Sequence, residues 1–79
     1  MRTTTHTYSN GARSFEIRLC GIEQQYATAW TIESVHEISR GGRTVVIRAM
    51  NWILTSTEEA ALDRACRNLD RWIEWGSQS

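Results

Sequence analysis

Two glycine-containing dipeptides, each lying between runs suited to β-strands, constrain the fold of this chain more than any other feature. Asn10-Gly11 separates THTYS from ARSFEIRL, and Gly41-Gly42 separates SVHEISR from RTVVIRAM. Asn-Gly and Gly-Gly readily adopt the positive φ angles that two-residue hairpin turns require. The sequence therefore predicts two β-hairpins, with strands near residues 3–8, 13–20, 26–39 and 43–50.

The first hairpin separates apolar from polar side chains. A two-residue turn at Asn10-Gly11 places His6 opposite Phe15 and Thr4 opposite Ile17, and Tyr8 shares their face. Because side chains alternate along a strand, the other face carries only polar groups. That polar set is Thr3, Thr5, Thr7, Ser14, Glu16 and Arg18.

A two-residue turn at Gly41-Gly42 likewise assigns faces to the second hairpin. The predicted core face carries Trp30, Ile32, Ser34, His36, Ile38, Val45, Ile47 and Ala49. The opposite face then carries an apolar strip with a charged rim, which is the composition of a modest protein interface. The strip is Val35, Val46 and Met50, and the rim is Glu33, Glu37, Arg18 and Arg48.

The region after residue 56 has the periodicity of an amphipathic helix, predicted over residues 57–75. Ser56-Thr57-Glu58-Glu59 fits a capping box, Thr55 with Glu58 offers a second frame, and Gly76 fits a C-terminal stop. At 100° per residue, seven apolar side chains fall on one arc. They are Ala61, Leu62, Ala65, Cys66, Leu69, Trp72 and Ile73. The predicted fold is α+β: an antiparallel meander of three to four strands with one C-terminal helix packed on one face.

Length and composition limit the chain to one small domain spanning residues 1–79. Within it, residues 1–12 are expected to form an edge strand or to be flexible, and residues 76–79 to form a flexible tail. No apolar stretch approaches the roughly 18 residues that span a bilayer, so no membrane contact is expected. The N-terminus lacks the apolar run of a signal peptide, and the expected location is the cytoplasm.

Catalytic and metal-binding signals are absent from the sequence. Cys20 and Cys66 lack the spacing of a zinc motif, and adding His6 and His36 gives only an unspaced ligand set. No phosphate loop or nucleophile motif occurs, and all nine basic residues are arginines. We therefore expect no enzyme, no cofactor and no metal. Trp30 and Trp72 are expected in the core, with Trp52 and Trp75 at its margins.

The leading functional hypothesis is a small binding or assembly module that contacts a protein partner, or a second copy, through the open sheet face. Its residues are Val35, Val46, Met50, Arg48, Glu33 and Glu37. The alternative is nucleic-acid or anion binding through an arginine cluster at the hairpin tips, formed by Arg13, Arg40, Arg43 and Arg71. Nine basic and nine acidic side chains cancel, which disfavours a general polyanion binder.

Overall fold

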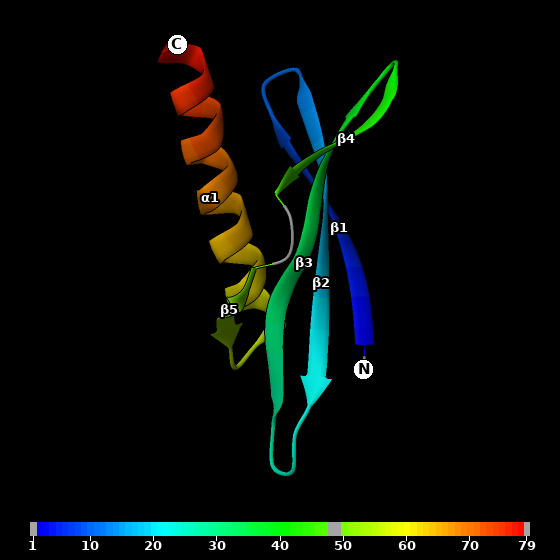
Figure 1. Ribbon diagram of the computed structural model, residues 1–79, viewed down its shortest axis with the longest axis vertical. Coiled ribbons are helices and arrows are strands. Elements are labelled where there is room, and N and C mark those ends of the chain that lie inside the picture. Colours follow the sequence, from blue (N-terminus) through cyan, green and yellow to red (C-terminus); the bar gives the residue numbers. More distant parts are fainter. Residues whose placement is uncertain (1, 48–49, 79) are drawn as a thin grey trace.

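The chain folds as an antiparallel sheet with one C-terminal helix, which confirms the predicted α+β class (Figure 1). The computed structural model describes residues 2–47 and 50–78, with the side chains of residues 50–53 and 77–78 excepted. Its elements are β1 (Arg2–Asn10), β2 (Arg13–Glu23), β3 (Thr28–Ser39), β4 (Gly42–Ile47), β5 (Met50–Thr55) and α1 (Glu58–Gln78). The strand expected over residues 43–50 corresponds to β4, and β5 is a further strand that was not predicted.

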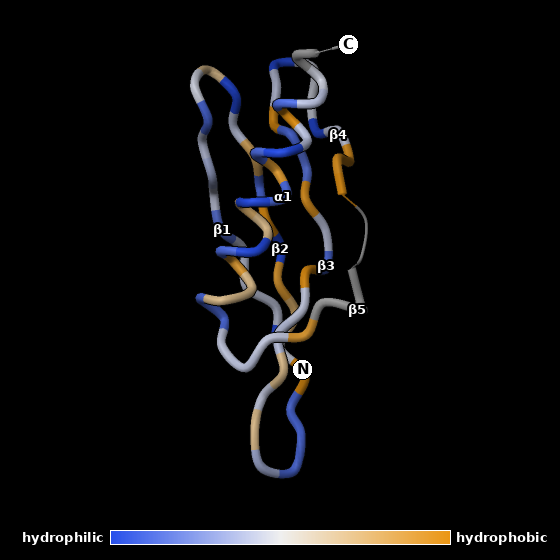
Figure 2. Tube along the Cα trace, turned by 90° about the vertical axis from the view of Figure 1, so that its left-hand side faces the viewer, coloured by the Kyte–Doolittle hydropathy of each residue, from blue (hydrophilic) through white to orange (hydrophobic). Residues whose placement is uncertain are grey.

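The strands form a meander in the order β1-β2-β3-β4, and β5 pairs with the N-terminal half of β3. The helix runs back across one face and contacts β2, β3 and β5. Seen with the helix toward the viewer, β1 and β4 lie at opposite margins of the sheet (Figure 2). The sheet therefore has one face covered by α1 and a second, open face.

The core lies between α1 and the two central strands. Because β2 alternates, its odd-numbered side chains from Phe15 to Leu19 all point toward the helix and are fully buried. Small residues of α1 let the helix approach the sheet closely. The core consists of Phe15, Ile17, Leu19, Trp30, Ile32, Val35, Ala61, Ala65 and Leu69.

The first hairpin has the predicted faces but a different register. Tyr8 pairs with Phe15 and His6 with Ile17, so the two turn residues are Gly11 and Ala12. Of these two turn residues only Gly11 has a positive φ, of 63°, which matches a turn with glycine first rather than the expected Asn-Gly turn. A shift of two residues leaves every side chain on its predicted face, and β1 is an ordered edge strand.

A bulge in β3 overturns the predicted faces of the second hairpin. Arg18 pairs with Ser34, but Leu19 pairs with Ile32, so Glu33 is an extra residue. An extra residue reverses the alternation beyond it. Val35 and Glu37 consequently lie on the helix side, and Val35 is fully buried. The prediction that Val35 faces outward is therefore wrong, as is the inward prediction for Ser34, His36 and Ile38.

A second bulge changes the facing of β4. Val35 pairs with Ile47 but His36 pairs with Val45, which leaves Val46 as the extra residue. Val46 and Ile47 both pack against the core, whereas Val45 is 50% exposed on the open face. The inward prediction for Val45 and the outward prediction for Val46 are thus both wrong. The turn residues are Arg40 and Gly41, because Ser39 pairs with Gly42.

Gly21 makes room for the largest core side chain. It pairs with Trp30, and a Cβ at this position would lie 3.0 Å from carbons of the Trp30 ring. Close approach of this kind is a recognised role of glycine within strands.

The helix begins one residue later than predicted and continues past Gly76. The backbone N–H of Ala60 donates to Thr57 Oγ1 at 3.1 Å, so Thr57 is the N-cap and neither predicted capping box forms. Since α1 extends to Gln78, the tail predicted from residue 76 is helical as far as it is described. Within the described part of the chain, no helix is long and apolar enough to cross a membrane.

Candidate protein-contact site

The predicted contact strip on the open face is not assembled. Val35 is buried under α1, Val46 packs against the core, and Glu37 lies on the helix side of the sheet. Glu33 remains exposed at the β3 bulge. Arg48 and the side chain of Met50 lie outside the described part of the structure. Sequence reasoning located these residues on one face because it assumed regular alternation through both bulges.

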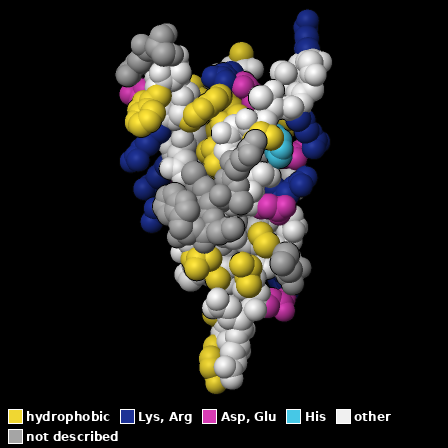
Figure 3. Space-filling model, in the orientation of Figure 1, with side chains coloured by type: hydrophobic (Ala, Val, Ile, Leu, Met, Phe, Trp, Pro, Cys, Tyr) yellow, Lys and Arg dark blue, Asp and Glu magenta, His cyan; other side chains and the backbone are white. Residues whose placement is uncertain are grey.

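Exposed apolar side chains gather instead beside the C-terminal half of α1. Trp72 is 40% exposed and Trp75 is 74% exposed, and they flank a hollow of about 230 Å³ that reaches Ile47 at the end of β4. Figure 3 shows hydrophobic side chains at this end of the helix and basic side chains along its outer side. We call the hollow the tryptophan groove; it is lined by Ile47, Asn68, Arg71, Trp72 and Trp75.

Helical spacing explains why these side chains share one flank. Positions 68, 71, 72 and 75 are separated by three or four residues, so they lie next to one another on α1. This flank faces β4, whereas the core arc centred on Ala65 and Leu69 faces β2 and β3. The sequence contains this signal, because Trp75 follows Trp72 by three residues within the predicted helix.

A stack of side chains holds Trp72 in place. The Phe15 and Trp72 rings meet edge to face, with centroids 6.3 Å apart, and the Arg13 guanidinium lies 5.0 Å from the Trp72 centroid. Arg13 also donates two hydrogen bonds of 2.7 Å to the Glu37 carboxylate. This bidentate pair lowers the pKa of Glu37. Both ring contacts and both hydrogen bonds restrain the wall of the groove before any ligand binds.

The four arginines of the alternative hypothesis have different environments. Figure 1 places the β1–β2 turn, the β3–β4 turn and the end of α1 at the same end of the molecule. Arg13 is paired with Glu37, and Arg43 lies 3.2 Å from Glu16. Arg40 and Arg71 have no ion-pair partner within the described chain. Two of the four guanidinium groups are thus already bound to carboxylates.

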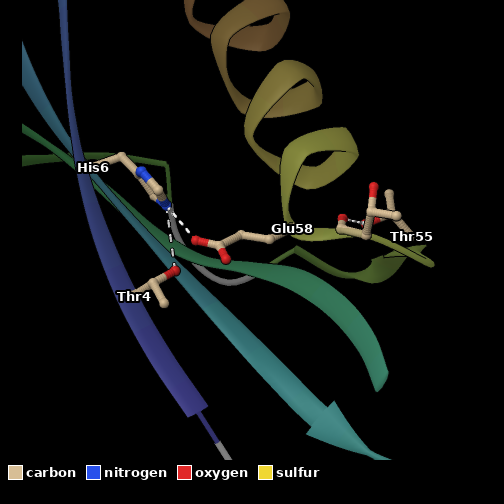
Figure 4. A network of polar contacts seen from close by, with 5 residues as sticks. Thr4, His6, Thr55 and Glu58 are labelled. Atoms are coloured by element: carbon tan, nitrogen blue, oxygen red, sulfur yellow. Dashed lines mark hydrogen bonds and ion pairs between the residues drawn. The ribbon is translucent and has the colours of Figure 1, made fainter. Parts of the chain in front are cut away.

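Polar contacts on the opposite flank of α1 tie the helix to the edge strand β1. His6 Nε2 lies 2.7 Å from Glu58 Oε1 and 3.4 Å from Thr4 Oγ1 (Figure 4). These contacts lower the pKa of Glu58, with the hydrogen bond from His6 as the largest cause. Twelve residues further along α1, Asp70 accepts hydrogen bonds from Tyr8 and Asn10. This network was not predicted, because it depends on the crossing position of α1 over β1.

The two histidines do not share a site. His6 lies on the helix side, and His36 lies on the open face opposite Glu16, where its Nδ1 atom is buried without a hydrogen-bond partner. Cys66 belongs to α1 and packs against the core on the helix side of the sheet. The conceivable ligand set of His6, His36 and Cys66 is therefore divided between the two faces of the sheet. Nowhere in the described chain do three or more histidine, cysteine or acidic side chains group as metal ligands.

Comparisons with protein-family models, with curated proteins and with solved structures gave no match to this chain.

Proposed function

We propose that this chain is a small non-enzymatic binding or assembly module that contacts another protein through the tryptophan groove. The observation that carries the proposal is the pair of exposed rings, Trp72 and Trp75, at an apolar hollow next to Ile47. Tryptophan and arginine are the side chains most enriched where protein interfaces concentrate their binding energy. This groove replaces the open sheet face, because Val35 at the centre of that strip is buried.

The chemistry of the groove supports a contact surface rather than an active site. Its polar side chains are Asn68 and Arg71, and neither an amide nor a guanidinium serves as a general base at neutral pH. The hollow of about 230 Å³ is also smaller than the roughly 300 to 1,000 Å³ of typical small-molecule sites. Cys20 and Cys66 are both free thiols, which supports a cytoplasmic location.

The second candidate is nucleic-acid or anion binding at the arginine cluster. Arg40 and Arg71 support it, because their guanidinium groups are not engaged by carboxylates in the described chain. Arg13 and Arg43 weaken it, because Glu37 and Glu16 already neutralise them. The open face adds Glu16 and Arg18 in contact at 3.7 Å, which is a mixed rather than a basic surface.

A matched pair of tryptophan and tyrosine variants tests the proposal. A library of random linear peptides is selected on the wild-type protein, and the enriched peptides are measured by calorimetry. Trp75→Ala should weaken binding about tenfold or more, since loss of an interface anchor typically exceeds 1.4 kcal/mol. Tyr26→Ala is the control, because Tyr26 is 91% exposed at the far end of the β2–β3 hairpin.

Three results would overturn the proposal. The first is a selection that enriches no peptide, and the second is equal loss of binding in the Trp75→Ala and Tyr26→Ala variants. The third is salt-dependent binding of nucleic acid that disappears in an Arg40→Ala, Arg71→Ala double variant, which would establish the second candidate instead.

A further inference from the structure

The tryptophan groove lies beside an unpaired strand edge. In the sheet order β1-β2-β3-β4, β4 has β3 on one side, and no other described strand pairs with it. Figure 2 shows α1 in front of the other strands, with β4 at the margin of the sheet. Ile47, the last residue of β4, lines the groove with Trp72 and Trp75 of α1. The apolar hollow therefore adjoins the C-terminal end of the edge strand, where Ile47 packs against the core.

An edge strand with an adjoining hydrophobic hollow suits an extended peptide. Main-chain groups along an edge can pair with an added strand, and alternate side chains of that strand project to one face. On the helix side of β4, such a side chain meets the rings of Trp72 and Trp75. A volume of about 230 Å³ suits one large apolar side chain better than a separate small molecule.

Charge around the groove selects the sign of the ligand. Arg71 is the one charged side chain among the residues that line the groove, and within the described chain it is not paired with a carboxylate. On the neighbouring strands, Glu37 binds Arg13 and Glu16 binds Arg43, and the acidic group closest in sequence to the groove is the exposed Glu74. The groove itself therefore presents a single positive group, the Arg71 guanidinium. A second copy of the chain would bring another Arg71 to the contact, which disfavours self-pairing along β4.

We propose that the groove takes an extended peptide segment of a partner protein, which adds to β4 as a further strand. The segment carries a large aromatic or branched apolar side chain, and an acidic residue two positions away that reaches Arg71. This inference rests on the proposed function, because it names the class of partner for the same groove.

The peptides enriched on the wild-type protein supply the test. We expect a shared pattern in which an acidic residue and a large apolar residue occupy alternate positions. A synthetic peptide with that pattern should slow hydrogen exchange at alternate amides of β4. The same peptide with alternate amides N-methylated should lose binding, because strand addition needs those donors.

Arg71→Ala and Arg67→Ala form the matched pair for the charge. Arg67 lies on the same helix but pairs with Asp63, away from the groove. Replacing glutamate by lysine in the peptide should weaken wild-type binding about two- to fivefold, as expected for an exposed ion pair. That difference should vanish in Arg71→Ala and persist in Arg67→Ala.

Failure of the inference and failure of the proposed function give different results. Peptides that bind in a Trp75-dependent way, but lack acidic residues or leave β4 exchange unchanged, would overturn only the inference. Absence of any enriched peptide would overturn both. Sedimentation showing a dimer that dissociates in Trp75→Ala would identify a second copy as the occupant, which also contradicts the acidic-peptide assignment.

Discussion

Asp70 illustrates how a single residue links distant parts of this chain. Its carboxylate accepts a hydrogen bond of 2.6 Å from the Tyr8 hydroxyl and one of 3.1 Å from Asn10 Nδ2. Both donors belong to the β1–β2 hairpin, and Asp70 lies near the middle of α1. These contacts orient the helix over the edge strand, so its other flank is directed toward β4 and forms the groove.

The Tyr8–Asp70 contact predicts a pH dependence of stability. The hydrogen bond to Asp70, with burial and the negative charge of Asp70, raises the pKa of Tyr8 to about 12. The ordinary value is about 10. Because the folded-state pKa is the higher one, this stabilisation is fully present below about pH 10 and is lost as pH rises through about 12.

Absorbance titration of the phenol checks this expectation. The chain has two tyrosines, so a Tyr26→Phe background leaves Tyr8 as the only one. We expect its titration near pH 12, and a lower midpoint after Asp70→Asn. A Tyr8 midpoint at the ordinary value, unchanged by Asp70→Asn, would show that the contact is not formed in solution.

At the scale of elements, the bulge at Glu33 decides which side chains of β3 reach the core. Trp30 and Ile32 precede it, and Val35 follows it on the same face. The step of three from Ile32 to Val35 is the sequence trace of this bulge. A regular strand would instead bury His36 and Ile38, at the cost of exposing Val35.

Substitutions of two valines distinguish the bulged strand from a regular strand. Val35 is fully buried, whereas Val45 is 50% exposed on the open face. Val35→Ala should lower the free energy of unfolding by about 1.5 to 3 kcal/mol, because it removes buried methyl groups and leaves a cavity. Val45→Ala should change it by less than about 0.5 kcal/mol. Urea denaturation measures the free energy of unfolding of both variants. A larger loss for Val45→Ala than for Val35→Ala would indicate a regular strand without the bulge.

At the scale of the molecule, the structure is elongated, with extents of 44 × 24 × 18 Å. The β2–β3 hairpin continues beyond the start of α1, and its tip is closed by a 2.8 Å hydrogen bond from Gln24 N–H to the Ala27 carbonyl (Figure 1). Tyr26 at this tip is 91% exposed. Packing is therefore concentrated in the part of the sheet beneath the helix.

Hydrogen exchange should follow this uneven packing. Amides of residues 15–19 in β2 should exchange slowest, since they require global unfolding, and those of residues 24–27 should exchange fastest. β1 should be intermediate, because its contacts through His6 and Tyr8 hold an otherwise exposed edge strand to α1. Equal protection at the hairpin tip and in central β2 would mean that the tip packs against something else.

Local sequence signals determined the fold class of this protein. Hairpin signals at Asn10-Gly11 and Gly41-Gly42, followed by a helical apolar arc through Ala65 and Leu69, were enough for the meander and the helix. These signals depend on backbone propensity and on periodicity within single elements, so they can be recognised without the rest of the chain. The faces of the first hairpin survived an error of two residues in register, because a shift of two preserves alternation.

Tertiary packing decided what local signals left undetermined. The bulges at Glu33 and Val46 are favoured by packing against the core, because they accompany the inward positions of Val35 and Ile47. Their effect on facing removed the predicted contact strip and left Trp72, Trp75 and Ile47 beside one another. That juxtaposition depends on how α1 crosses the sheet, which is set by contacts between residues far apart in sequence, such as Tyr8 with Asp70. Alternation within a strand carries no information about such contacts, and for that reason only the three-dimensional structure located the groove.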